Sequence, residues 1–136
     1  MIDQQALTYT AMITGTTAAT TARTARLDCQ DVDYATIIVT TSAEANTNST
    51  NVVASLLESD DTIVTNFATF DASHERTIDN TSEAVGVFHV DRRGRKRYLR
   101  LVLTPDATTN GAVIVSAVAA VKDATQAAVA ATVSIS

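Results

Sequence analysis

The sequence is poor in the residues that stabilise many small proteins or build their binding sites. Its 136 residues include one cysteine, one proline, four glycines and no tryptophan, and aromatic residues make up 4%. The single cysteine, Cys29, cannot form an internal disulfide, which excludes a disulfide-based scaffold. The four glycines lie far apart and form no phosphate-binding loop. No apolar run reaches the ~18 residues of a membrane-spanning helix, so we expect no membrane partner.

Catalytic and metal-binding patterns are also missing from the sequence. His74 and His89 have no cysteine or carboxylate at zinc spacing, so we expect both histidines to be structural. No serine lies in a nucleophile motif. The acidic group Glu58, Asp60 and Asp61 is consistent with a Ca²⁺ site or with a turn at the end of a strand, and it lacks the spacing of an EF-hand. We therefore expect no enzyme activity and no cofactor.

Threonine and alanine, at 23 residues each, dominate what is present. Threonine, valine and isoleucine favour pleated, half-buried surfaces, so the composition favours strands. In the clearest alternating segment, Leu99, Leu101 and Leu103 share one face. Turn-forming residues separate the apolar segments at intervals typical of an all-β sandwich or barrel. The predicted strands are residues 34–41, 51–59, 85–91, 96–104 and 112–121, with weaker candidates at 24–29, 63–64 and 67–70.

The length corresponds to one domain, whose two ends differ in composition from the middle. We expect an N-terminal extended arm at residues 1–24, a β-sandwich at 25–121 and a C-terminal arm at 122–136. In an extended C-terminal arm, Val129, Val133 and Ile135 lie on one side. The arm is then either a frayed end or a strand that adds to another chain, and its alanines leave a helix open as well.

Charge is unevenly distributed. The chain has 15 acidic and 10 basic residues, a net charge of −5, yet six of the ten basic residues fall between positions 92 and 100. The net charge and the scarcity of interleaved aromatic residues argue against nucleic acid as a partner. We expect this basic turn to meet an acidic protein surface or the chain's own acidic loops, or to be simply solvated. Its interface candidates are Arg92, Arg93, Arg95, Lys96 and Arg97.

Three segments occur in an order that resembles a known family. They are Leu56-Leu57-Glu58-Ser59-Asp60-Asp61, then Lys96-Arg97-Tyr98-Leu99-Arg100, then Val115-Ser116-Ala117-Val118-Ala119. Over roughly residues 34–121 the chain resembles the capsid decoration, or cement, proteins of tailed bacteriophages. Relatives in that family usually have a Gly-Ser type of turn after the paired aspartates and often end soon after the last strand. This chain instead has Thr62-Ile63-Val64 after the aspartates and continues to Ser136.

The resemblance implies a jelly-roll-like antiparallel β-sandwich that binds the outer surface of the major capsid protein shell and stabilises the head. It also implies a homo-oligomer, a dimer or a trimer, made in the host bacterial cytoplasm and located on the capsid exterior. The basic turn and the two termini, including Val129, Val133 and Ile135, are then the expected contacts. Two other functions stay open: a head–tail connector or tail structural protein, and a carbohydrate-binding or adhesin-like sandwich.

Overall fold

The structure is a computed structural model that describes residues 7–18, 22–43, 51–69, 75–78, 85–105, 113–123 and 133–135. These residues form strands and one 3-10 helix, η2 (Val64–Asn66). The strands are β1 (Leu7–Ala18), β2 (Arg23–Asp28), β3 (Val32–Ala43), β4 (Val52–Ser59), β5 (Ala68–Thr69), β6 (Glu75–Ile78), β7 (Val85–Asp91), β8 (Tyr98–Pro105), β9 (Val113–Asp123) and β10 (Val133–Ile135). The described part of the chain contains no helix long and apolar enough to cross a membrane.

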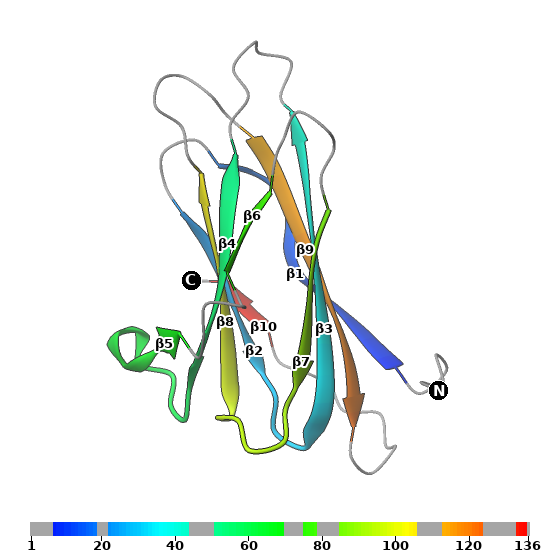
Figure 1. The fold of residues 1–136 in the computed structure, drawn as a ribbon, viewed down its shortest axis with the longest axis vertical. Coiled ribbons are helices and arrows are strands. Elements are labelled where there is room, and N and C mark those ends of the chain that lie inside the picture. Colours follow the sequence, from blue (N-terminus) through cyan, green and yellow to red (C-terminus); the bar gives the residue numbers. More distant parts are fainter. Residues whose placement is uncertain are drawn as a thin grey trace.

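The strands form two antiparallel sheets packed face to face (Figure 1). Sheet A has the order β1-β9-β3-β7, and sheet B has the order β10-β2-β8-β4-β5, with β6 also paired to β4. The pairing is nested: β1 with β9, β2 with β8, β3 with β7, and β4 with β5 and β6. A long hairpin rolled up in this way is a jelly roll. The predicted all-β, jelly-roll-like antiparallel sandwich is confirmed.

The core lies between the sheets and consists of aliphatic residues at alternate strand positions. Leu99, Leu101 and Leu103 of β8 are fully buried, as the alternation in the sequence predicts. They face sheet A, whose strand β3 contributes Ile37 and Val39. Alternate residues point to opposite faces of a strand, so each sheet also presents an outer face. These two outer faces differ in composition, as described below.

All five clearly predicted strands are present, with ends shifted by up to two residues. The weaker candidate at 24–29 corresponds to β2, and β5 covers part of the candidate at 67–70. The strand predicted at 63–64 is wrong, because Ile63 directly precedes η2 and Val64 is its first residue. This segment is held by side-chain hydrogen bonds to Asp61, which replace the ladder of a strand.

Strand β1 occupies residues that the sequence assigned to the N-terminal arm. Its pairing with β9 shifts register on both sides of Ile13, and these irregularities leave two consecutive residues, Met12 and Ile13, buried in the core. The simple alternation that marks a strand in the sequence is therefore absent. The division at residues 24 and 122 stays a prediction, but residues 7–18 pair along the whole length of the sandwich.

Candidate interaction surface

The basic turn connects β7 of sheet A to β8 of sheet B. The side chain of Arg92 holds its two ends together by hydrogen bonds to the backbone of the same turn. The Arg92 side chain is buried, and its guanidinium donates hydrogen bonds to the carbonyl oxygens of Lys96 and Arg97, the latter at 3.1 Å. The backbone N–H of Arg92 donates to the carbonyl oxygen of Asp33 at 2.8 Å. Gly94 has a φ of 75°, a conformation that suits glycine. Arg92 is therefore a structural residue of the turn.

Three other arginines of the turn form ion pairs with acidic residues of the same chain. Arg93 pairs with Asp91 at 2.6 Å, Arg95 with Glu58 at 3.7 Å and Arg97 with Asp28 at 2.8 Å. The hydrogen bonds from Arg93 lower the pKa of Asp91 to about 2. The hydrogen bond from Arg97 is the largest cause that lowers the pKa of Asp28. The sequence left three possible environments for the basic turn: an acidic partner, the chain's own acidic residues, or solvent. The structure shows contacts with the chain's own acidic residues.

These contacts tie three turns into one surface at one end of the sandwich, which we call the turn surface. It comprises the β2–β3 turn, the β4–β5 loop and the β7–β8 turn. The side chain of Arg97 pairs with Asp28, and its backbone carbonyl oxygen accepts a hydrogen bond from the N–H of Cys29 at 2.9 Å. The N–H of Lys96 donates to Glu58 Oε2 at 3.2 Å. The turn surface is thus cross-linked before any partner binds, which lowers the entropy lost on association.

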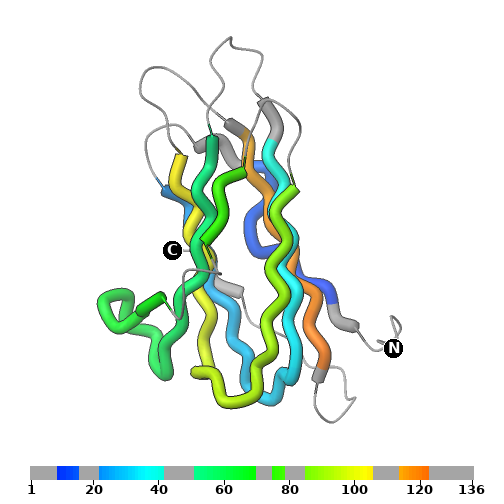
Figure 2. Tube along the Cα trace, in the orientation of Figure 1, coloured from blue at the N-terminus to red at the C-terminus, as the bar shows by residue number. Residues whose placement is uncertain are grey.

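The β4–β5 loop projects from the side of sheet B (Figure 2) and is organised around Asp61. The Asp61 carboxylate accepts hydrogen bonds from the N–H of Ile63 at 2.9 Å and from Asn66 Nδ2 at 2.8 Å. The Asp61 N–H donates to Ser59 Oγ at 3.2 Å. The hydrogen bond from the Asn66 side chain is the largest cause that lowers the pKa of Asp61, and the bond from the Ile63 N–H is the next. The acidic group at 58–61 thus forms a turn at the end of β4, which is one of the two roles that the sequence predicted for it; the other was a Ca²⁺ site.

The same loop exposes two aliphatic side chains next to each other. Ile63 is 56% exposed and Val64 is 53% exposed. Below them, the loop is anchored on the outer face of sheet B: the guanidinium of Arg100 lies 5.9 Å from the centre of the Phe67 ring, and Arg26 Nη1 donates to the carbonyl oxygen of Thr62 at 3.4 Å. An exposed aliphatic pair on an anchored loop is suited to enter a pocket on a partner surface.

The C-terminal candidates fall partly within the described residues. Val133 and Ile135 lie in β10, which pairs antiparallel with β2 of the same chain, opposite Leu27 and Ala25. Strand β10 forms one edge of sheet B. Val129 lies outside the described residues. Residues 133–135 thus form a strand within the same chain, and addition of this segment to another chain stays a prediction.

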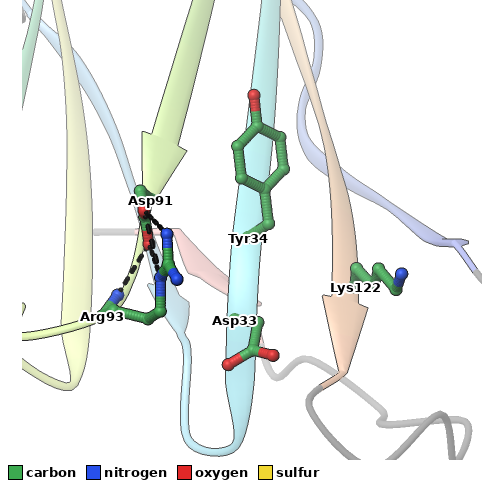
Figure 3. A pocket seen from close by; sticks show the side chains of 5 residues that line it. All are labelled: Asp33, Tyr34, Asp91, Arg93 and Lys122. Carbon is green, nitrogen blue, oxygen red and sulfur yellow. Dashed lines mark hydrogen bonds and ion pairs between the residues drawn. The ribbon is translucent and has the colours of Figure 1, made fainter. Parts of the chain in front are cut away.

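Near the turn surface, an open pocket lies on the outer side of sheet A (Figure 3). Its lining residues are Asp33 and Tyr34 of β3, Asp91 of β7, Lys122 of β9, and Arg93 of the basic turn. The Arg93–Asp91 pair forms one wall, and Lys122 stands on the neighbouring side of β3 (Figure 3). The sequence did not single out Asp33, Tyr34 or Lys122, because only the pairing of β3 with β7 and β9 brings these strands side by side.

The histidines and acidic residues form no metal site in the part of the chain that the structure describes. His89 lies on β7, where its Nδ1 is 3.2 Å from Thr36 Oγ1 and its ring stacks with Tyr34. This cross-strand contact is the structural role expected for it. His74 lies outside the described residues.

Comparison of the chain with family models, with curated proteins and with solved structures finds no match in any of the three.

Proposed function

We propose that the protein is a capsid decoration protein of a tailed bacteriophage, which binds the outside of the major capsid protein shell through the turn surface. The observation that carries this proposal is the exposed pair Ile63 and Val64 on a loop cross-linked to two other turns. Exposed aliphatic anchors surrounded by charged groups are the anatomy of a protein–protein interface. The jelly-roll topology agrees with the fold that the family resemblance implies.

A decoration protein has to present a fixed shape to many equivalent sites on a shell. Each copy adds contact area between neighbouring capsid subunits, and many modest contacts sum over the particle. Loops pre-organised by hydrogen bonds and ion pairs bind with a smaller entropic cost than loops that order on contact. The Asp61 network and the Arg97–Asp28 pair supply this pre-organisation in the turn surface.

Co-sedimentation with undecorated phage capsids tests the proposal. We expect the protein to sediment with capsids and to raise the temperature at which they break open. Replacing both anchors, I63D with V64D, should weaken binding about a hundredfold, because burial of unpaired carboxylates costs several kcal/mol. The double variant T77D with T104D is the control. It adds the same charge at exposed positions of β6 and β8 and should bind like the original chain.

Failure of the original chain to sediment with capsids overturns the proposed function. Equal binding by the double anchor variant and the original chain rejects Ile63 and Val64 as the contact. The number of copies per particle separates decoration from a connector or tail role: a shell-covering number supports decoration, and a single ring supports the connector.

A further inference from the structure

The outer face of sheet A carries a row of apolar residues that crosses all four strands. The register places Ala11 of β1 opposite Val118 of β9, Val118 opposite Ile38 of β3, and Ile38 opposite Val87 of β7. Ile38 is 36% exposed and Val118 is 38% exposed. Toward the two edges, Tyr9 on β1 and Val85 on β7 are more exposed still, at 60% and 57%.

The outer face of sheet B is different in character. There Arg26 of β2 lies opposite Arg100 of β8, and the β4–β5 loop covers part of this face through Phe67. An antiparallel sheet that faces water normally carries polar side chains on that side. On sheet A the apolar row lies between a row that contains Thr36 and His89 and a row that contains Thr40 and Ser116. Exposed aliphatic residues that cross the middle of all four strands indicate that another molecule covers this face.

Charged groups of both signs border the apolar row at its end near the turn surface. Lys122 lies on β9, and Asp33 and Asp91 lie on β3 and β7 (Figure 3). Lys122 forms no ion pair with any residue that the structure describes. Lys122 and Asp33 thus stand on opposite sides of the line that separates β9 from β3, whereas Asp91 is already paired with Arg93. If a second copy of the same face is rotated by half a turn about that line, Lys122 of each copy faces the acidic side of the other.

We propose that two copies of the chain pair through the outer faces of sheet A, about a twofold axis that runs parallel to β9 and β3 and between them. This rotation exchanges β9 with β3 and β1 with β7. Val118 then meets Ile38 of the second copy, and Lys122 meets Asp33 of the second copy. A twofold axis across the strands would instead place the charged end against the opposite end of the face. Such an interface is isologous, so each contact occurs twice.

The available area is sufficient for a dimer. Four strands spaced about 4.8 Å apart, with the 11 residues of β9 rising about 3.3 Å each, span roughly 600 Å². Pairing of two such faces buries about 1,200 Å² in total, at the lower end of the range for stable interfaces. The proposed axis leaves the strands of the two facing A sheets, one from each copy, nearly aligned, which is a common arrangement for packed sheets. This inference is independent of capsid binding, which we assign to the turn surface.

Sedimentation equilibrium of the full chain in the micromolar range tests the pairing. We expect a dimer for the original chain and a monomer for V118E, whose dissociation constant should rise about a hundredfold because an unpaired carboxylate is buried. The control is V102E, which makes the same change at a half-buried valine on the outer face of sheet B and should leave the dimer intact. Circular dichroism checks that each variant is folded.

A charge exchange tests the orientation and does not depend on the folding of V118E. K122E alone and D33K alone should each weaken the dimer by placing like charges together, and the double variant K122E with D33K should restore it. A monomeric or trimeric original chain overturns the proposal. A folded V118E that dimerises like the original chain, or a double variant no tighter than its single variants, also overturns it.

Discussion

Asp28 and Arg97 are 69 positions apart in the sequence and are joined by two hydrogen bonds, Nε to Oδ1 at 2.9 Å and Nη2 to Oδ2 at 2.8 Å. Asp28 ends β2 and Arg97 precedes β8, so the pair closes the β2–β8 ladder at the turn surface. Two parallel bonds between a guanidinium and a carboxylate fix both distance and angle. The pair therefore fixes the β7–β8 turn relative to the β2–β3 turn.

The Asp28–Arg97 pair makes stability depend on pH in the acid range. The pKa of Asp28 is lowered from 3.8 in the folded protein, so ionised Asp28 contributes stability above about pH 4 that is lost as the pH falls through the folded-state pKa. D28N should be less stable than the original chain at pH 7, and the difference should shrink toward pH 3. Urea unfolding over a pH series measures this, with D60N at an exposed position as the control.

Arg92 should be sensitive even to a conservative replacement. Its Nη2 donates to two carbonyl oxygens from a buried position, and a lysine side chain ends one bond short of the position of Nη2. R92K should lower the free energy of unfolding by about 1.5–3 kcal/mol, the range for hydrogen bonds of charged groups. The control R93K changes an exposed arginine of the same turn and should have little effect in the same denaturant titration.

Loss of the Asp61 carboxylate should loosen the β4–β5 loop without unfolding the sandwich. The carboxylate accepts the hydrogen bond from the Ile63 N–H, so D61A should speed amide hydrogen exchange at Ile63 by about tenfold or more. Exchange of core amides, such as that of Leu101, should stay unchanged. D60A removes the neighbouring exposed carboxylate and is the matched control. Slow exchange at Ile63 in D61A would show that the loop is held by other contacts.

Leu101 lies at the centre of sheet B, opposite Ala25 of β2 and Leu56 of β4. Its side chain is fully buried, so L101A leaves a cavity and should lower the free energy of unfolding by about 2–5 kcal/mol. The next residue, Val102, points to the opposite face and is half-buried, so V102A should cost less than about 1 kcal/mol. Chemical denaturation of both variants checks the assignment of faces, and equal losses would contradict it.

Cys29 should be unreactive in the folded protein. Burial raises the pKa of its thiol to about 11, so little thiolate exists at pH 8. Iodoacetamide at pH 8 should leave Cys29 unmodified over hours and modify it within minutes in denaturant, as measured by mass. Rapid modification without denaturant would mean that the turn between β2 and β3 opens readily.

Local patterns in the sequence predicted those parts of the fold that depend on neighbouring residues. The alternation of Leu99, Leu101 and Leu103 was enough to place β8 and its buried face, because that pattern is a property of one strand. Strand β1 was not predictable in this way, since irregular pairing with β9 buries Met12 and Ile13 together. The strand expected at 63–64 failed because side-chain hydrogen bonds to Asp61 stabilise a loop there.

The sequence by itself determined the all-β composition, the buried faces of the clear strands and the concentration of basic residues in one turn. These follow from side-chain shape and from spacing along the chain. Asp91 is two positions from its partner Arg93, but only the tertiary structure decided that Asp28 and Glu58 also neutralise the turn, because they reach it through strand pairing across long sequence separations. It also decided that Ile38 and Val118 lie side by side on an outer face, a relation set by the register between β3 and β9.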